Sequence, residues 1–318
     1  MRTVLVTGAG GFLGQALLAQ LLEDPELRIQ ACLRGRNLPP ELCRHPRLVL
    51  YQGDLKDADF CDELCSGVDL IIHLAGRAHT GGGIELQWAQ SYTPTQMLGE
   101  AALRQGVAKL IFVSSIKAAD PGQSAYAEIK YRQEEWLLDL HQRGQLKVVC
   151  LRPALIYGAG MRGNLATLLR LLRRPRLRLL PRPSGVMGMI GLQDCCRAII
   201  AALDVEALEG GVWQLDDGTA YPIASLFTQV RRQLGLPAPW MWIPRPLLWL
   251  AAQLGELSAP FTHVSLGRGT YRTLYLERFT ADSRFGALTG FEPTQTLQRE
   301  LPVLLESLNV GLNKSLDK

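Results

Sequence analysis

The stretch Arg2-Thr-Val-Leu-Val-Thr-Gly-Ala-Gly-Gly-Phe-Leu-Gly14 decides the fold, because it joins a short apolar strand to a glycine-rich turn and an apolar helix. Glycines in such a turn permit a close approach of the backbone to a pyrophosphate at the helix N-terminus. Gly8, Gly11 and Gly14 fit the spacing G-x-x-G-x-x-G. The spacing G-x-G-x-x-G fails, because Leu13 occupies its last position. The sequence therefore predicts a dinucleotide-binding turn.

Strand and helix patterns alternate through the first half of the chain, which predicts an α/β fold with a doubly wound parallel sheet. Apolar runs predict strands at 3–7, 29–33, 48–51, 70–74, 110–113 and 147–151, with helices at 12–23, 58–65, 86–105 and 125–143. After residue 153 the alternation stops and prolines and arginines become more frequent. We therefore expect a Rossmann domain at 1–157, to which 192–216 returns, and a smaller, mostly helical substrate-binding lobe at 158–318.

The composition excludes several classes of protein. The net charge is only +4, which gives no reason to expect a nucleic-acid partner, and the arginines at 170–182 are interpreted as a solvated helix end with a basic turn. Seven cysteines without a C-x-x-C pair predict reduced thiols in a cytoplasmic protein, and no metal site is expected. No apolar run is long enough to span a bilayer, and the N-terminus does not resemble a signal peptide. The aromatic segment 240–254 is expected to pack in the lobe or in a dimer contact, rather than lie at a membrane surface.

The end of the second predicted strand indicates the type of cofactor. An acidic residue there binds the ribose 2′-hydroxyl of NAD, whereas an arginine accommodates the 2′-phosphate of NADP. The strand ends in Arg34-Gly-Arg36 without an acid, so NADP(H) is favoured and NAD remains possible. Asp54 is expected to accept a hydrogen bond from the adenine amino group, and His73 is interpreted as a core histidine. The candidate cofactor-binding residues are Gly8, Gly11, Phe12, Leu13, Gly14, Arg34, Asp54, Leu55, Leu74, Ala75 and Gly76.

Three residues form the candidate catalytic group. Ser115 closes the fifth predicted strand, and Tyr126 and Lys130 lie one turn apart on the following predicted helix. A phenol ordinarily titrates near pH 10, and a neighbouring ammonium group favours its deprotonated form. Tyr126 is therefore predicted to act as a general acid or base toward a substrate oxygen to which Ser115 also hydrogen-bonds.

The order of these motifs resembles the extended short-chain dehydrogenase/reductases, the NAD-dependent epimerase/dehydratase family. The resemblance covers nearly the whole chain and rests on Gly8-x-x-Gly11-x-x-Gly14, Gly53-Asp-Leu55, His73-Leu-Ala-Gly76, Val113-Ser-Ser115, Tyr126-x-x-x-Lys130 and Arg152-Pro153. Three longer stretches, 73–79, 114–117 and 156–164, are similar to one branch of the family. That branch contains the 4-keto reductases and 4-epimerases of UDP-N-acetyl-6-deoxyhexosamines in bacterial O-antigen synthesis.

The resemblance implies roles for individual residues. Ser115, Tyr126 and Lys130 correspond to the catalytic triad, and Lys130 also to a ligand of the nicotinamide ribose. Arg77, His79, Ser115 and Asn164 correspond to substrate-binding positions. Two departures concern the substrate side: Tyr126 follows Ser115 after only eleven positions, and Met187 stands where relatives usually carry a diphosphate-binding arginine.

The expected function is NADPH-dependent reduction of the C4 ketone of a UDP-linked 4-keto-6-deoxy-N-acetylhexosamine in polysaccharide precursor synthesis. Arg34 favours this reaction over a UDP-N-acetylhexosamine 4-epimerase, which keeps a bound NAD through its cycle. The short connection before Tyr126 also leaves open a non-catalytic NADP-binding regulator on the same fold. The expected partner is a nucleotide sugar, and relatives often form homodimers, so a homodimer is one option for this chain.

Overall fold

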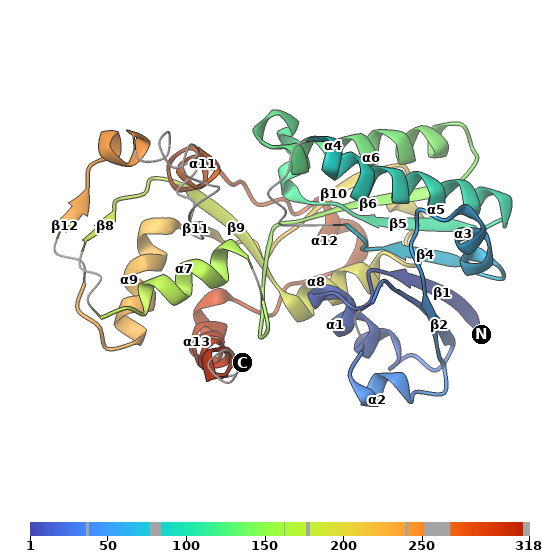
Figure 1. The fold of residues 1–318 in the computed structure, drawn as a ribbon, viewed down its shortest axis with the longest axis horizontal. Helices are drawn as coiled ribbons and strands as arrows, with labels where there is room; N and C mark the ends of the chain where they lie inside the picture. Colours follow the sequence, from blue (N-terminus) through green and yellow to red (C-terminus); the bar gives the residue numbers. More distant parts are fainter. Residues whose placement is uncertain are drawn as a thin grey trace. The chain divides into compact units, whose positions relative to one another are not determined.

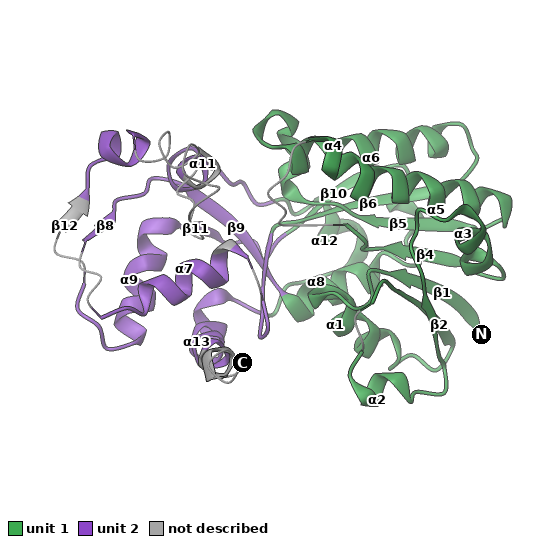
Figure 2. Cartoon of the chain, in the orientation of Figure 1, with its two compact units in different colours: residues 1–154, 192–215, 282–294 green, residues 155–191, 216–281, 295–318 purple. Residues whose placement is uncertain are grey.

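The structure, a computed structural model, describes residues 1–35, 38–76, 84–161, 163–175, 179–238, 241–250 and 268–313. The chain divides into two compact units (Figure 2). Unit 1 comprises residues 1–154, 192–215 and 282–294, and unit 2 comprises 155–191, 216–281 and 295–318. The sequence prediction left 282–294 with the lobe, whereas the division of the structure gives this segment to unit 1. That unit 1 binds NADP and unit 2 binds substrate stays a prediction.

Unit 1 is built on a seven-stranded sheet in which every pair of neighbouring strands is parallel. Its order is β10-β6-β5-β4-β1-β2-β3, so the chain reverses direction across the sheet between β1 and β4. This is the doubly wound order that the alternating pattern predicts. The strands are β1 (Arg2–Thr7), β2 (Leu27–Leu33), β3 (Leu48–Gln52), β4 (Leu70–His73), β5 (Lys109–Val113), β6 (Lys147–Pro153) and β10 (Val212–Leu215).

Helices cover both faces of this sheet (Figure 1). One layer contains α3 (Ala58–Cys65), α5 (Thr93–Arg104) and α6 (Ala125–Gln142), and the opposite layer contains α1 (Phe12–Leu21) and α8 (Leu192–Ala201). Apolar side chains from the first layer and the sheet, such as Leu98, Leu137 and Phe112, form a core without solvent exposure. The remaining helices and turns of unit 1 are α2 (Pro40–Cys43), α4 (Ile84–Gln87), η1 (Trp88–Tyr92), η2 (Ile116–Ala119), η3 (Pro121–Gln123), η4 (Glu206–Leu208) and α12 (Arg284–Thr289).

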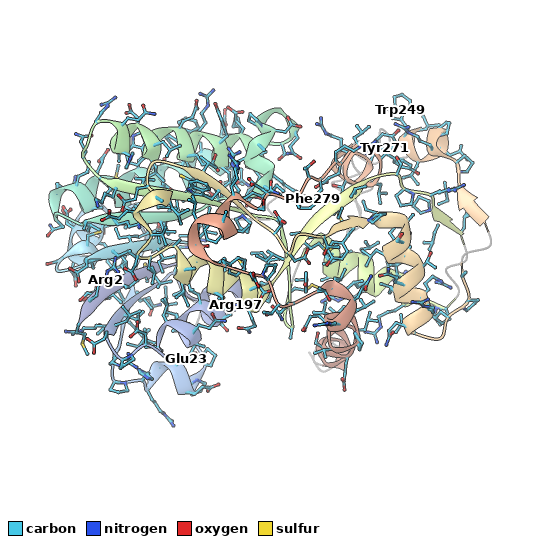
Figure 3. All side chains as sticks on the ribbon, turned by 180° about the vertical axis from the view of Figure 1, so that it is seen from behind. Arg2, Glu23, Arg197, Trp249, Tyr271 and Phe279 are labelled. Atoms are coloured by element: carbon cyan, nitrogen blue, oxygen red, sulfur yellow. The ribbon has the colours of Figure 1, made fainter. Side chains whose placement is uncertain are left out.

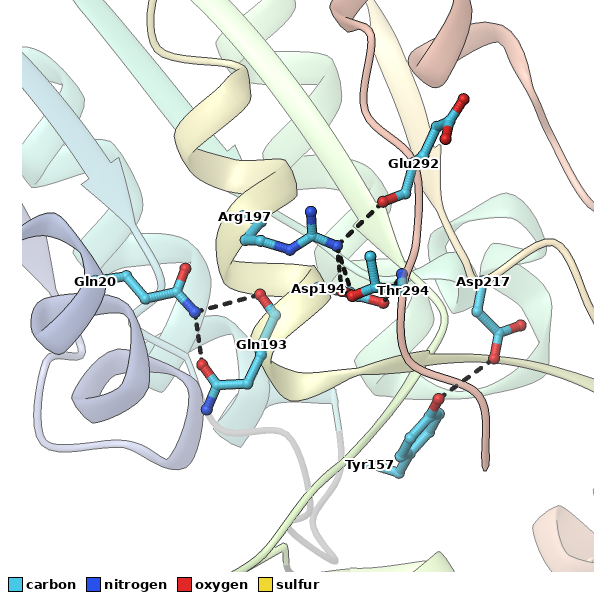
Figure 4. Close-up of polar contacts among 8 residues, drawn as sticks. All are labelled: Gln20, Tyr157, Gln193, Asp194, Arg197, Asp217, Glu292 and Thr294. Atoms are coloured by element: carbon cyan, nitrogen blue, oxygen red, sulfur yellow. Dashed lines mark hydrogen bonds and ion pairs between the residues drawn. The ribbon is translucent and has the colours of Figure 1, made fainter. Parts of the chain in front are cut away.

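Residues 282–294 are fixed to unit 1 by a network around Asp194 (Figure 4). The Asp194 carboxylate has no solvent exposure and accepts hydrogen bonds from the Thr294 N–H at 2.8 Å and its hydroxyl at 3.0 Å. Arg197 forms an ion pair with Asp194 and donates to the Glu292 carbonyl oxygen at 3.1 Å. A buried carboxylate is tolerated when it is paired and hydrogen-bonded in this way.

Unit 2 contains two small sheets besides its helices. In the first, β9 (Val186–Gly191) lies between the antiparallel β11 (Ala220–Pro222) and the parallel β7 (Leu155–Tyr157). The second pairs β8 (Leu179–Pro181) in parallel with β12 (Met241–Ile243). The helices are α7 (Asn164–Leu172), α9 (Ile223–Gln233), α11 (Arg268–Tyr275) and α13 (Leu297–Asn313). The region is thus helical as predicted, with short strands that the sequence pattern did not indicate.

Two buried polar groups form hydrogen bonds that connect separate segments of unit 2. The Asp217 carboxylate accepts hydrogen bonds from the phenols of Tyr221 at 2.5 Å and Tyr157 at 3.5 Å (Figure 4). Burial raises the pKa of Asp217, against the hydrogen bonds that it accepts. Arg231, which is fully buried, donates to the Pro237 carbonyl at 2.8 Å and to the Leu172 carbonyl at 3.4 Å, at the C-terminal end of α7.

Candidate active site

The turn between β1 and α1 has no room for side chains at its glycines. Gly8 has a φ of +70°, and a Cβ atom there would lie 2.8 Å from the Ala75 nitrogen. A Cβ atom on Gly14 would lie 2.5 Å from the Gly8 carbonyl oxygen. The Gly11 N–H closes the turn by donating to the Gly8 carbonyl at 2.9 Å. The bare backbone that a pyrophosphate requires is therefore built into this turn, so its residues fit a dinucleotide.

The other candidate cofactor residues follow the neighbouring strands β2, β3 and β4 at the same edge of the sheet. Arg34 is exposed directly after β2. Asp54 is exposed after β3, and its side chain accepts a hydrogen bond from the Lys56 N–H at 3.1 Å. Leu55 is buried beside it, whereas Leu74, Ala75 and Gly76 follow β4 and retain partial or full exposure. Phe12 and Leu13 open α1 and are half-buried.

The Ser115 side chain lies near the Tyr126 phenol, close enough to lower its pKa, despite the short connection between them. Two successive turns, η2 and η3, span this connection, and the Ser124 hydroxyl starts α6 by accepting from the Ala127 N–H at 3.2 Å. Burial raises the pKa of the Tyr126 phenol above its ordinary value, and the nearby Ser115 hydroxyl opposes this rise. The phenol is therefore protonated at neutral pH, which differs from the expectation that a nearby ammonium lowers its pKa.

The position of Lys130 explains the difference. Lys130 is 4% exposed, and its ammonium group donates to the Val113 carbonyl at 3.0 Å. The Nζ atom lies 4.4 Å from the centroid of the Phe112 ring. Burial lowers the pKa of Lys130 to about 8, although the nearby carboxylate of Glu134 favours the charged form. The ammonium is thus held at the end of β5, and a Cβ on Gly76 would be 3.5 Å from Nζ.

A buried ion pair one turn beyond Lys130 is a feature that the sequence analysis missed. Glu134 is 2% exposed, and its carboxylate accepts from the Arg152 Nε atom at 2.9 and 3.2 Å. Arg152 also donates to the Ala118 carbonyl at 3.5 Å, in the turn that follows Ser115. The signal in the sequence was the helical spacing of Tyr126, Lys130 and Glu134, which places the three on one side of α6.

A second missed feature is a chain of hydrogen bonds through His73. The Thr95 hydroxyl donates to the Ser91 carbonyl at 2.9 Å, so it must accept from His73 Nε2, at 2.8 Å. His73 Nδ1 then accepts from the Thr7 hydroxyl at 2.7 Å, and Thr7 accepts from the Ala75 N–H at 3.4 Å. His73 is fully buried, and burial lowers its pKa to about 3, in keeping with a core histidine. The chain links β1 and β4 to the loop at Ala75.

The predicted substrate residues are only partly covered by the described structure. Arg77 and His79 lie outside the described residues. Asn164 is the first residue of α7, and nothing further of its side chain is described. Met187 lies in β9 and is 6% exposed, as an apolar core residue would be. Within the described ranges, no group of histidine, cysteine and acidic side chains could hold a metal ion, and no helix is long and apolar enough to cross a membrane.

Comparisons with known proteins agree with this geometry. The model of the NAD dependent epimerase/dehydratase family matches residues 4–215. The chain is 23% identical to a UDP-glucose 4-epimerase of Vibrio cholerae, over 93% of this chain and 92% of the relative. It is 28% identical to a ceramide reductase of Caulobacter vibrioides, over 92% of both chains. A UDP-N-acetylglucosamine 4-epimerase from Methanobrevibacter ruminantium has a similar fold, with a TM-score of 0.76 at 18% identity, over 98% of this chain and 99% of the other.

The chain therefore belongs to the NAD-dependent epimerase/dehydratase family. It is an enzyme of the NAD(P)-dependent oxidoreductase type, as the family and its curated relatives are. The sequence-based predictions of the family and of the doubly wound fold are confirmed.

Proposed function

We propose that this enzyme uses NADPH to reduce the C4 ketone of a UDP-linked 4-keto-6-deoxy-N-acetylhexosamine. The observation that carries the proposal is the arrangement around Tyr126, in which Ser115 lies near the phenol and the buried Lys130, one turn along α6, is held by the Val113 carbonyl at 3.0 Å. Reduction of a ketone to an alcohol consumes one hydride and one proton. The phenol supplies the proton, so the resting state described for Tyr126 is the one that this direction of reaction requires.

Each residue of the candidate triad has a distinct task in this proposal. The Ser115 hydroxyl donates a hydrogen bond to the ketone oxygen and polarises it. Tyr126 delivers its proton to the same oxygen, and Lys130, whose ammonium group is held at the end of β5, would bind the nicotinamide ribose. A bound nicotinamide supplies the hydride and becomes oxidised.

NADPH is favoured by the residues that end β2. Arg34 is exposed there, and its guanidinium suits a phosphate as a hydrogen-bonding partner. The glycine turn would hold the pyrophosphate, and Asp54 would accept from the adenine amino group. Arg77, His79 and Asn164 remain our candidates for binding the nucleotide sugar, on the strength of the resemblance alone.

A 4-epimerase is the second candidate, because two of the compared proteins are 4-epimerases of UDP sugars. The two reactions differ in their use of cofactor. A reductase consumes one NADPH for each product, whereas an epimerase returns the hydride to its substrate and needs no added cofactor. Both reactions employ a tyrosine as acid and base, so the triad alone does not separate them.

The deciding experiment supplies the purified enzyme with UDP-linked and dTDP-linked 4-keto sugars and NADPH, and follows the loss of reduced-nicotinamide absorbance. A parallel reaction contains UDP-N-acetylhexosamines without added cofactor. We expect NADPH consumption in the first reaction and no interconversion in the second. Interconversion of the 4-epimers with NAD that copurifies would contradict the proposal, and cofactor binding without turnover would favour the non-catalytic regulator.

A further inference from the structure

Three large apolar side chains of unit 2 are exposed within four residues. Residues 245–250 form a short helix directly after β12. Leu247, Trp249 and Leu250 expose 59%, 51% and 50% of their surface, whereas Leu248 between them is 5% exposed. Single exposed apolar residues are normal, but a group of this size usually marks an interaction site.

The neighbouring elements extend this apolar group and add positive charge. Ile243 of β12 lies opposite Pro181 of β8, so the exposed Arg182 follows close to the start of the helix. The Arg245 side chain donates to the Tyr271 hydroxyl at 2.8 Å, and Figure 3 labels Tyr271 and Trp249 in this part of unit 2. The exposed Leu276 follows α11. We call the exposed side chains of the helix 245–250, together with the neighbouring arginine, the Trp249 surface; it comprises Arg182, Arg245, Leu247, Trp249 and Leu250.

Charge is distributed unevenly between the two units. Unit 2 contains sixteen basic and seven acidic residues, and its first segment, 155–191, contains seven arginines and no acidic residue. Unit 1 contains eighteen basic and twenty-three acidic residues. The small net charge of the whole chain therefore conceals a strongly basic unit. A surface with exposed tryptophan and leucine side chains on a basic unit complements a bilayer whose lipid headgroups are anionic.

We propose that unit 2 docks on the surface of an anionic lipid bilayer through the Trp249 surface. The sequence led us to expect that segment 240–254 packs in the lobe or in a dimer contact, but Leu247, Trp249 and Leu250 are exposed. Trp249, Leu247 and Leu250 lie at the level of the headgroups, and the arginines contact lipid phosphates. A second copy of this chain fits less well, because it would bring the same excess of positive charge to the contact. Nucleic acid would pair with the arginines but leaves the exposed leucines unexplained. This proposal does not depend on the substrate proposed above.

The test measures cosedimentation of the full chain with vesicles. One set contains equal parts of phosphatidylcholine and phosphatidylglycerol, and the other contains phosphatidylcholine alone. We expect binding to the anionic vesicles, weaker binding at high salt, and little binding to neutral vesicles. The double variant Trp249→Ala/Leu250→Ala should bind the anionic vesicles about tenfold more weakly, because it loses the apolar contact.

The control variant is Leu50→Ala/Leu288→Ala, which removes two apolar side chains of unit 1 that are 40% and 44% exposed. It should bind vesicles as the natural chain does, and both variants should keep the natural melting temperature. Equal binding by both double variants would overturn the proposal. An absence of vesicle binding would also overturn it. In that case, dimerisation that depends on concentration and is lost in Trp249→Ala/Leu250→Ala would identify a second copy as the partner. Tight binding to single-stranded RNA would identify nucleic acid.

Discussion

At the scale of single residues, the chemistry of the candidate active site depends on the protonation states of Tyr126 and Lys130. The Tyr126 phenol is protonated at neutral pH, because a phenol ordinarily titrates near pH 10 and burial raises this pKa further. The Lys130 ammonium group donates to the Val113 carbonyl. A tyrosine in this state is ready to act as an acid. The sequence identified Ser115, Tyr126 and Lys130 as candidates through their spacing, but spacing cannot say where an ammonium group points.

Removal of the Tyr126 hydroxyl tests the assignment of the acid. Tyr126→Phe should lower kcat by about a thousandfold, because general acid catalysis typically contributes factors of this order. The affinity for cofactor should change little, since the ring remains and only the reacting hydroxyl is lost. The measurement is steady-state turnover together with a cofactor titration. A variant that retains natural turnover would show that another group supplies the proton.

The Lys130 ammonium predicts a pH dependence of the rate. Its pKa of about 8 lies below the ordinary lysine value, so the cation is lost as the pH rises through about 8. We expect kcat/KM to fall above that pH. Glu134→Gln removes the carboxylate that favours the charged form, so the fall should move to lower pH.

The matched control for this pH profile is Asp139→Asn on the same helix. Asp139 pairs with Arg143 at the surface and is 44% exposed. Its replacement should leave the pH profile of the natural enzyme unchanged. An identical profile for Glu134→Gln and Asp139→Asn would contradict the influence assigned to the buried carboxylate.

At the scale of elements, the strands and most helices follow from hydrophobic pattern, but their irregularities do not. The helical pattern over 86–105 gives no sign that five residues, η1, form a π-helical turn. Pro94 lacks an N–H and so removes a donor from this helix. The Ser91 carbonyl accepts from the Thr95 hydroxyl at 2.9 Å and from the Gln133 side-chain amide at 3.0 Å. A partner contributed by α6 is a tertiary contact, which periodicity along one segment cannot reveal.

The close packing of α1 on the glycine turn predicts a specific loss of stability. Gly14→Ala would place a methyl group 2.5 Å from a backbone oxygen, which cannot move aside as a flexible side chain would. We expect a loss of about 2 kcal/mol in the free energy of unfolding, with weakened cofactor binding. Chemical denaturation measures the first effect. Gly122→Ala is the control, since a Cβ atom there would lie 4.0 Å from an Asp120 side-chain oxygen. Equal stability of the two variants would contradict this packing.

The hydrogen-bond chain through His73 predicts how the free energy of unfolding depends on pH. The pKa of this histidine is about 3 in the fold, against 6.5 for the ordinary group. Between these values the unfolded chain binds a proton that the folded chain does not, so stability is lost as the pH falls from about 6.5 toward 3. In this window the free energy of unfolding of the natural chain should fall more steeply than that of the variant His73→Gln. The difference should be up to about 1.4 kcal/mol for each pH unit. If the plots of unfolding free energy against pH were parallel for the natural chain and His73→Gln, a buried neutral histidine would be contradicted.

At the scale of the whole molecule, the sequence predicted the class of fold and of enzyme, while unit 2 was predicted least well. The sheet of unit 1 repeats one pattern seven times, so each strand supports the interpretation of the next. Unit 2 is held by contacts between distant segments, such as Gly188 against the Phe279 ring and Tyr221 bonded to the Leu297 N–H at 3.2 Å. Such contacts have no local signature. Pattern alone therefore does not predict how unit 2 is assembled.

The most direct test of the account follows the hydride itself. The enzyme is supplied with NADPH deuterated at the nicotinamide C4 position that it uses, together with a UDP-linked 4-keto-6-deoxy-N-acetylhexosamine. We predict one deuterium at C4 of each sugar produced, one NADPH consumed for each turnover, and loss of both in Tyr126→Phe. A sugar product without deuterium, or turnover that leaves NADPH unconsumed, would contradict the account.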